Sequence, residues 1–366
     1  MTNRRAIVWV SALACLASIA CGSALAQDGT PWIDTHIHLL PGPPERADYA
    51  ATIGVALSAM NESGIRAAVV MPPPFVKGMA VHDWRDFAAL LRQYPGRFAF
   101  LGGGGTLNVM LHDPANAKPD TAQFAEFERI AMAILAAGAS GFGEIAVHHL
   151  SYMQGHPYEW VAPDHPFLLL LADLAAQHRV VLDLHLDLVI SEMAPPPRFK
   201  GENPVNLREN AAAFERLLAH NREARIIWAH AGSHPLPSLV PALARDLLAR
   251  HPNLYMSLRM PVGSFPKPTG DGAAKAPPNF VVGADWVVNL EWLRLLQEFP
   301  DRFVIGNDQF IANPALSGPG PGLRFAQWAA SSRELTQGLL KQLPADLSRR
   351  IGTENAVRLY RLEVAR

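Results

Sequence analysis

Strand-like and helix-like segments alternate along nearly the whole chain, which restricts the folds open to it. Each strand-like run is short, rich in aliphatic, β-branched or aromatic residues, and separated from the next by a longer stretch. Such alternation indicates parallel βαβ units, and eight of these units close into a (β/α)8, or TIM, barrel of the α/β class. The eight expected strands span residues 32–40, 65–73, 97–103, 140–149, 179–190, 224–230, 253–260 and 301–308.

The stretches between the expected strands have the apolar periodicity of amphipathic helices. A doubly wound open sheet would show the same alternation, but no G-x-G-x-x-G turn follows the first expected strand. The closed barrel is therefore the better prediction. Helical spacing is clearest over residues 121–138, 166–178, 207–221, 236–251 and 286–299.

Proline-rich segments follow expected strands rather than expected helices. They occupy residues 41–44, 72–74, 195–197 and 261–278. In a parallel barrel the segments after the strands lie at the C-terminal face, where such enzymes build their active sites. The glycines at 102–105 are expected to form a loose loop after the third strand, because no Lys-Ser/Thr pair follows to complete a phosphate site.

The first 26 residues have the three parts of a secretory signal peptide. A basic start precedes an apolar run over residues 6–20, and residues 24–26 form an A-x-A cleavage site. The apolar run is shorter than the ~20 residues that a membrane-spanning helix needs. We expect cleavage after Ala26, a single domain over residues 27–366, and a periplasmic or secreted protein. A lipoprotein modified at Cys21 is the alternative.

Composition limits the partners of the mature chain. Removing the signal peptide shortens the chain from 366 to 340 residues and, with Arg4 and Arg5 gone, changes the formal charge from −1 to −3. This leaves no strong basic field for nucleic acid or for anionic lipid. Both cysteines, Cys15 and Cys21, lie in the signal peptide, so nitrogen and oxygen must hold any metal. A small molecule is the expected partner, and a homo-oligomer stays open.

The first expected strand carries two histidines one residue apart. Side chains in a strand alternate between its faces, so Asp34, His36 and His38 are expected to share one face. Ile33 and Ile37 are expected on the other face, which packs against helices. A single H-x-H pair is weak evidence in a chain with 14 histidines. Its value depends on ligand-type residues at later strand ends.

Four later strands supply such residues at regular intervals. Successive separations are 41, 45 and 78 residues, which match one, one and two βα units. Strands ending at one barrel face would bring these side chains together with the first-strand pair. Asp34, Asp183 and Asp187 are expected to orient histidines or to join buried networks. The four later residues are Glu144, His185, His230 and Asp308.

Six phrases of the sequence resemble the amidohydrolase superfamily, in particular its amidohydrolase-related branch. The resemblance implies a metal-dependent hydrolase on a barrel that spans most of the mature chain. It also implies one or two divalent ions among His36, His38, His185, His230 and Asp308. The phrases are DTHIH at 34–38, GFGEI at 141–145, DLH at 183–185, WAHAG at 228–232, RFVIGND at 302–308 and IGTENAVRLYRL at 351–362.

Glu144 divides two versions of the expected metal site. Some members of the branch use a fourth-strand carboxylate to bridge two metals, and others hold one metal without it. With Glu144 as the bridge, one ion would be bound by Glu144, the first-strand pair and Asp308. The other ion would be bound by Glu144, His185 and His230. Without it, the first-strand pair, His185 and Asp308 would hold a single ion. His230 would then be an acid–base or substrate-polarising group, and Glu144 a structural carboxylate.

The ligand types favour zinc among the divalent metals. Imidazole and carboxylate without sulfur suit Zn²⁺, while Mn²⁺, Fe²⁺ and Ni²⁺ remain open. Zinc lowers the pKa of a bound water to about 7 and polarises a carbonyl or phosphoryl oxygen. Asp308 is expected to accept the water proton and deliver it to the leaving group. These residues predict hydrolysis of an ester, lactone, amide or similar bond.

Four further residues are weaker candidates for contact with substrate. Arg259, near the end of the seventh strand, could bind a substrate carboxylate through two hydrogen bonds or form an outward ion pair. His148 and His234 could line the barrel mouth or be ordinary loop residues. Asp187 could reach substrate or orient His185.

Two other functions fit parts of the same pattern. A metal-dependent decarboxylase of an aromatic or muconate-like acid would use nearly the same ligands, as in relatives of this branch. A non-catalytic binding protein on a barrel scaffold would leave the ligand-type residues unexplained. The substrate itself depends on loops that the sequence does not decode.

Overall fold

The computed structural model describes residues 30–43, 46–78, 82–152, 154–199, 201–260, 278–283, 286–313 and 321–364. The expected signal peptide and residues 261–277 of the last proline-rich segment lie outside these ranges. Among the described helices, none is both long enough and apolar enough to span a bilayer.

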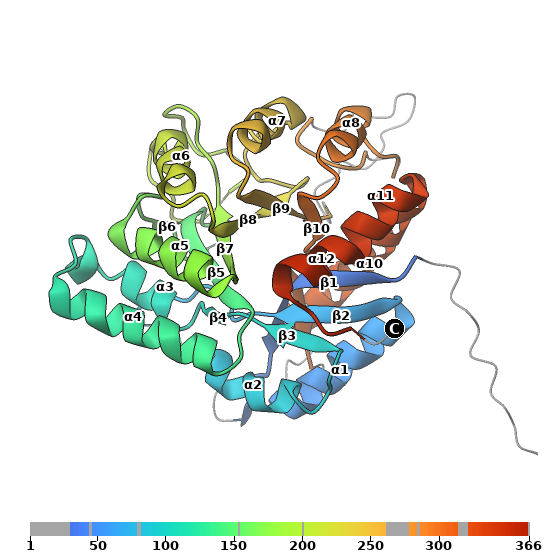
Figure 1. Ribbon diagram of the computed structural model, residues 1–366, viewed down its shortest axis with the longest axis horizontal. Coiled ribbons are helices and arrows are strands. Elements are labelled where there is room, and N and C mark those ends of the chain that lie inside the picture. The colour runs from blue at the N-terminus through green and yellow to red at the C-terminus, as the bar shows by residue number, and fades with distance from the viewer. Residues whose placement is uncertain are drawn as a thin grey trace, which may run out of the picture.

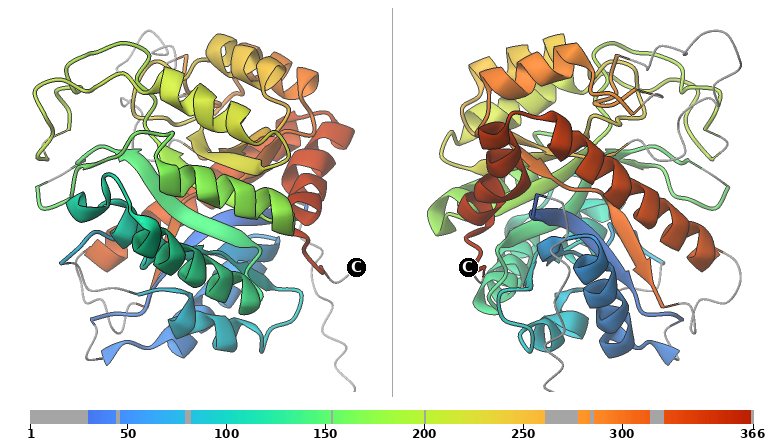
Figure 2. Two further views of the ribbon diagram at one scale, coloured as in Figure 1. Left: turned by 60° about the vertical axis from the view of Figure 1, so that its left-hand side comes forward. Right: turned by 90° about the vertical axis from the view of Figure 1, so that its right-hand side faces the viewer.

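Eight strands form a closed barrel, as the sequence predicts (Figure 1). All the barrel strands run parallel, and neighbours along the chain pair in the sheet. Figure 2 shows the eighth strand beside the first. The strands are β1 (Trp32–Leu40), β2 (Ile65–Val70), β3 (Phe98–Phe100) with β4 (Gly102–Gly103), β5 (Gly141–His149), β7 (Val181–Leu186), β8 (Arg225–Ala231), β9 (Leu254–Leu258), and β10 (Phe303–Ile305) with β11 (Gln309–Ala312).

The third and eighth strands are each interrupted. The two pieces of each strand belong to different sheets, so the two sheets together form one ring. One sheet has the order β11-β1-β2-β3 and the other β10-β9-β8-β7-β5-β4. The third strand pairs first with β2 and then with β5, and the eighth pairs first with β9 and then with β1. The Thr35 hydroxyl donates to the Ile305 carbonyl at 2.9 Å across the second junction.

Helices surround the strands, and polar residues start several of them. Asp48, Asp83 and Asp120 cap three of the helices through backbone N–H groups. A short strand, β6 (Glu159–Trp160), pairs antiparallel with β5. The helices are α1 (Tyr49–Glu62), α2 (Trp84–Leu91), α3 (Leu107–Leu111), α4 (Thr121–Ala136), α5 (Pro166–His178), α6 (Ala211–His220), α7 (Pro241–Arg250), α8 (Leu290–Glu298), α10 (Pro321–Gln342), α11 (Ala345–Arg349) and α12 (Asn355–Tyr360), with single helical turns at Pro114–Asn116 and Arg350–Glu354.

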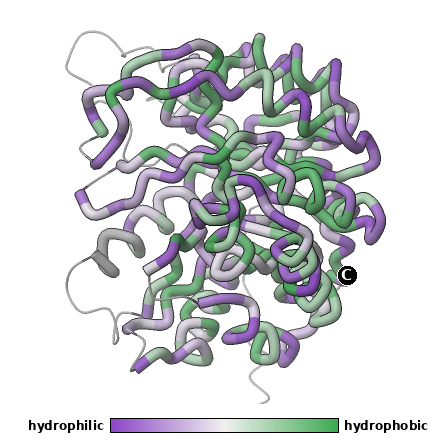
Figure 3. Tube along the Cα trace, turned by 90° about the vertical axis from the view of Figure 1, so that its left-hand side faces the viewer, coloured by the Kyte–Doolittle hydropathy of each residue, from purple (hydrophilic) through white to green (hydrophobic). Residues whose placement is uncertain are grey.

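The apolar core has two layers. The larger one lies between the strands and the helices, and Figure 3 shows the hydropathy of the trace changing repeatedly along the outer helices. The smaller one fills the barrel interior and includes Ile33, Val69, Val181 and Val304. Three residues of the C-terminal helix α12 belong to this inner cluster, namely Ala356, Leu359 and Tyr360.

A bulge in β1 corrects one expectation from the sequence. Asp34 pairs with Ala68 and Ile37 with Val70, so three steps along β1 match two along β2. Ala68, Val70 and Ile37 all belong to the layer beneath the helices. Asp34 therefore lies on this outer face and not on the face of the two histidines, and Ile33, expected on the outer face, belongs to the interior cluster. Simple alternation fails here because the bulge adds one residue between Asp34 and Ile37.

The glycines after the third strand also differ from expectation. Gly102 and Gly103 form β4, which pairs with β5, rather than a loose loop. A β-carbon at Gly102 would approach side-chain atoms of Ile134 and Trp84 to 2.9 Å. Glycine is needed here because the strand passes directly beneath packed helices.

Candidate metal centre

Four candidate ligands lie at irregular points of the barrel strands. His36 lies in the bulge of β1, Glu144 in a bulge of β5 and His230 in a bulge of β8. Asp308 lies in the break between β10 and β11. His230 and Asp308 have positive φ angles of 68° and 53°. Residues other than glycine rarely adopt this conformation unless the surrounding structure holds them there.

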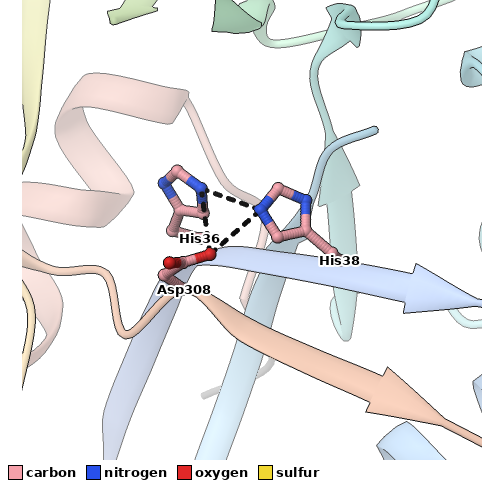
Figure 4. A group of neighbouring side chains, drawn as sticks. All are labelled: His36, His38 and Asp308. Atoms are coloured by element: carbon pink, nitrogen blue, oxygen red, sulfur yellow. Dashed lines mark hydrogen bonds and ion pairs between the residues drawn. The ribbon is translucent and has the colours of Figure 1, made fainter. Parts of the chain in front are cut away.

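His36, His38 and Asp308 point toward one another, as Figure 4 shows. The Nε2 atoms of the two histidines are 3.2 Å apart. Asp308 Oδ1 lies 3.1 Å from His38 Nε2 and 4.0 Å from His36 Nε2. The first and eighth strands are neighbours in the closed barrel, so residues 270 positions apart in sequence meet at its mouth.

Glu144 lies between two pairs of histidines. Its Oε2 atom is 3.4 Å from Nε2 of both His36 and His38. Its Oε1 atom is 2.9 Å from His185 Nδ1 and 3.2 Å from His230 Nε2. The two nitrogens of this second pair are themselves 3.0 Å apart. Each carboxylate oxygen thus faces a different pair of imidazoles.

An oxygen atom behind the cluster orients the ring of His38, and carboxylates lie farther behind two other rings. The Met71 carbonyl oxygen lies 3.0 Å from His38 Nδ1, and because a carbonyl only accepts, this nitrogen carries the proton. In the neutral ring, Nε2 then keeps its lone pair for the centre. His185 Nε2 and His36 Nδ1 are each 3.6 Å from an oxygen, of Asp187 and Asp183 respectively.

Asp34 holds the first and eighth strands in register beneath the site. Its carboxylate accepts hydrogen bonds from the backbone N–H of His36 and of Asn307, both at 3.1 Å. The side-chain amides of Asn307 and Gln309 also donate to it, at 3.3 and 2.5 Å. Asp34 is fully buried. It therefore fixes the positions of His36 and Asp308 through their neighbouring backbone.

The electrostatics of the cluster favour bound positive charge. Burial alone would lower the pKa of His38 and of His185, but bonds to Asp308 and Asp187, and to Glu144, outweigh it and raise both to about 10. Burial would raise the pKa of Glu144, yet the neighbouring histidines hold it well below 4.5. A divalent ion would supply the positive charge that these carboxylates attract.

The donor set fits a divalent metal. Two groups of three residues have ligand atoms within 4.8 Å of one another: His36, His38 and Asp308, and His36, Glu144 and His230. All are nitrogen or carboxylate oxygen, as zinc and related metals prefer. Burial lowers the pKa of His230 to about 3, so its imidazole is neutral, the form that binds metal.

Arg259 lies at the edge of this cluster and forms an inward ion pair. Its Nη1 atom is 3.1 Å from Asp308 Oδ2, and about a third of its side chain is exposed. Burial would raise the pKa of Asp308, but Arg259 and then His38 hold it well below its usual value. The partner of Arg259 is thus a candidate ligand, and part of the Arg259 side chain remains accessible to solvent.

His148, His234 and Asp187 form a buried group next to His185. The Asp187 carboxylate accepts from the Leu150 backbone N–H at 2.8 Å and lies 3.6 Å from both His185 Nε2 and His234 Nε2. His148 Nδ1 lies 2.5 Å from the Asp187 carbonyl oxygen. All three side chains are almost completely buried. Their placement favours support of His185 over contact with substrate.

Sequence reasoning missed His149. Its ring centroid lies 3.9 Å from that of His185, closer than any ring of the candidate ligands. A second bulge in β5, between Ala146 and His148, reverses the facing of the residues that follow. Counting every second residue from Glu144 therefore predicted that His148, rather than His149, faces the barrel mouth. The doublet His148-His149 was the available signal, because one of two adjacent residues must face inward.

Comparison with known protein families identifies the chain. The family model described as Amidohydrolase matches residues 33–362. The chain belongs to the amidohydrolase family. The resemblance expected from the sequence is therefore confirmed, and the chain is a metal-dependent hydrolase of the amidohydrolase superfamily. A search of curated proteins finds no significant match.

Several solved structures are similar to this amidohydrolase over most of its length. A beta-aspartyl dipeptidase from Fervidobacterium islandicum AW-1 is 13% identical to this chain and has a TM-score of 0.48. The matched region covers 91% of this chain and 75% of the dipeptidase chain. A dihydroorotase from Saccharomyces cerevisiae is 11% identical, with coverages of 92% and 85% and a TM-score of 0.47. A TatD homologue from Escherichia coli K12 is 12% identical, with coverages of 91% and 98% and a TM-score of 0.47.

Proposed function

We propose that this amidohydrolase binds two divalent ions bridged by Glu144. His36, His38 and Asp308 complete the first ion's ligands, and His185 and His230 complete those of the second. The observation that carries this proposal is the position of Glu144, whose two oxygens face different histidine pairs at 2.9–3.4 Å. Imidazoles on both sides of one carboxylate supply the nitrogen and oxygen donors that two such ions would need. Zinc is the proposed metal.

The proposed reaction is hydrolysis of an ester, lactone or amide bond of a small molecule. Bound metals of this kind supply a nucleophile from water at neutral pH and polarise the oxygen of the bond to be cleaved. Asp308 accepts the proton of the attacking water and returns it to the oxygen or nitrogen of the leaving group. One bond forms at the acyl carbon, one breaks, and no redox partner is needed.

Arg259 supports this role of Asp308. The ion pair occupies Asp308 Oδ2, so Oδ1 is the oxygen directed toward the two first-strand histidines. The guanidinium also keeps the carboxylate ionised, as a proton acceptor must be. The exposed part of Arg259 is available to a substrate carboxylate.

A paired substitution tests the bridge. Glu144→Gln keeps the shape of the side chain but removes its charge, and we expect it to lose at least one of two zinc ions per chain. Glu159→Gln is the matched control, since Glu159 is equally buried but bonds to Asn108, outside the cluster. Metal content by mass spectrometry and turnover of p-nitrophenyl acetate are the measurements.

The outcomes separate the candidate activities. Two ions in wild type and in Glu159→Gln, with fewer ions and lost turnover in Glu144→Gln, support the bridged hydrolase. One ion in wild type, unaffected by Glu144→Gln, contradicts it. Release of CO₂ from a hydroxybenzoate without ester, lactone or amide hydrolysis would instead indicate the decarboxylase.

We also propose that the protein is exported and processed. The support is the basic, apolar and small-residue pattern of the first 26 residues. Mass spectrometry of protein from the periplasmic fraction should give a chain that starts at Gln27. A full-length chain retained in the cytoplasm would contradict this.

A further inference from the structure

A wall of aromatic rings extends from the candidate ligand His185. His149 lies against His185, with ring centroids 3.9 Å apart. Tyr152 and His156 follow, at 5.1 and 4.7 Å from His149, and Phe199 lies 5.2 Å beyond Tyr152. The wall comes from the segments after β5 and β7, which belong to the C-terminal face of the barrel. It meets the metal centre at His185.

The Tyr152 hydroxyl is buried and has no hydrogen-bond partner among the described residues. A phenol both donates and accepts, and burying it unpaired is unfavourable. In native structures the large majority of such groups have a partner, and exceptions occur at catalytic sites or where a water or ion completes them. Nδ1 of His149 and Nδ1 of His156, on the same wall, are also buried, and the described part of the chain offers them no partner. Three unpaired polar groups in one place indicate a surface that binds something polar.

The position of Tyr152 is fixed by the protein before any ligand arrives. The preceding residue, Ser151, exchanges two hydrogen bonds with the Asn203 side chain, at 2.9 and 2.8 Å. The Glu202 backbone N–H donates to the Ser151 hydroxyl at 3.0 Å. Tyr152 also packs on a small apolar cluster built around Leu150, Val189, Leu207 and Leu236. The two loops therefore hold the ring in place together.

The charges that act on Tyr152 belong to the metal centre. Burial raises the pKa of its hydroxyl well above 10, and Asp187 raises it further, while Arg259 lowers it. Asp308 and Glu144 raise it as well. The phenol is thus uncharged at neutral pH and lies within electrostatic range of these four groups. It can donate a proton in a hydrogen bond and will not compete with the carboxylates for a cation.

We propose that the Tyr152 hydroxyl binds the substrate, donating a hydrogen bond to the oxygen of the acyl group that is hydrolysed. This inference rests on the proposed hydrolytic function. The substrate oxygen becomes more negative as water adds to the acyl carbon, so the hydrogen bond strengthens in the transition state. The tyrosine keeps its proton throughout and no bond to it forms or breaks. Its partner is an uncharged carbonyl compound rather than a cation.

The test compares two tyrosines of the same loop. Tyr152→Phe removes the hydroxyl and keeps the ring. Tyr158→Phe is the matched control, because Tyr158 packs on the same apolar cluster and its hydroxyl is not among the buried unpaired groups. With p-nitrophenyl acetate, we expect Tyr152→Phe to lower kcat roughly 100-fold with little change in KM, as removal of an oxyanion donor does. Metal content and melting temperature should stay at wild-type values.

Binding of acetohydroxamate, an acyl analogue that chelates metals, supplies a readout independent of turnover. By calorimetry on the zinc-loaded enzyme, Tyr152→Phe should weaken binding roughly tenfold, in line with loss of one hydrogen bond to a charged group, whereas Tyr158→Phe should not. Equal affinity in Tyr152→Phe and wild type overturns the proposal, as does absence of binding to wild type. Acetohydroxamate binding that depends on Tyr152, without hydrolysis of any acyl probe, would refute the proposed reaction and keep the tyrosine assignment.

Discussion

Single side chains at the centre act through the groups behind them. His38 is oriented by the Met71 carbonyl, and His185 lies beside Asp187. Asp34 acts on the site through the backbone of His36 and through residues on either side of Asp308. The sequence identified the residue types that meet at the mouth, but it could not identify these supports. Carbonyl groups leave no mark in a sequence, and the bulge of β1 determines which way Asp34 points.

Removing the side chain of His36 or of Asp308, two members of the first proposed ligand group, should abolish activity while the fold persists. We expect His36→Ala and Asp308→Ala each to lower kcat/KM for p-nitrophenyl acetate by about 10³-fold or more, because a ligand and a proton acceptor are lost. Far-ultraviolet circular dichroism should be unchanged. His220→Ala, which affects an exposed pair with Asp173, is the control and should remain fully active. Undiminished turnover in either ligand variant would refute the assignment.

His112 should make the folded state sensitive to acid. Burial lowers its pKa from 6.5 to about 4, although its hydrogen bond to the Ala146 carbonyl opposes the shift. Between these values the unfolded chain binds a proton that the folded chain does not, so lowering the pH favours unfolding. One such proton changes the free energy of unfolding by up to ~1.4 kcal/mol per pH unit.

Urea unfolding at pH 7 and pH 5 measures this effect. The loss of stability at pH 5 should be smaller in His112→Gln than in wild type, because the variant has no group to protonate there. An equal loss in the two proteins would show that His112 is protonated in the folded state as readily as in the unfolded chain.

At the scale of elements, sequence reasoning succeeded where strands and helices are regular. The helix expected at 166–178 is α5 with the same bounds, and regular β7 places His185 beside its neighbours as alternation predicts. Errors occurred in β1 and β5, where bulges shift the facing of Asp34 and bring His149 rather than His148 to His185. A bulge depends on pairing between strands, so one strand's own sequence does not reveal it.

The C-terminal helix α12 should contribute strongly to stability because it completes the interior of the barrel. Leu359 is fully buried in the inner cluster with Ile33 and Val304. Leu359→Ala should lower the free energy of unfolding by about 2–5 kcal/mol, the usual range for a buried leucine. Val357→Ala, half-buried on the same helix, should be milder. Urea unfolding measures both, and equal small losses would mean that α12 only covers the surface.

The whole molecule joins distant parts of the chain through barrel closure. Residues from the first, fourth, fifth, sixth and eighth strands meet because interruptions in the third and eighth strands let two sheets form one ring. The alternation of segments, the absence of a G-x-G-x-x-G turn and the spacing of the ligand-type residues together predicted this closure and the meeting of the histidines. The sequence left the choice between one ion and two open, because it depends on which way each oxygen of Glu144 points.

Metal should stabilise the barrel as well as activate it. An ion held by residues from several strands binds the folded chain and not the unfolded one, so it raises the melting temperature. Dialysis against a chelator should abolish turnover and lower the melting temperature, and added zinc should restore both. A chelated protein with full activity would contradict the metal-dependent account.

The bridged pair of ions is tested most directly by X-ray anomalous scattering at the zinc edge from crystals of the zinc-loaded protein. Two peaks about 3.5–4 Å apart are predicted, one next to Glu144 Oε2 with His36, His38 and Asp308, and one next to Oε1 with His185 and His230. A single peak out of reach of Glu144 would contradict the account.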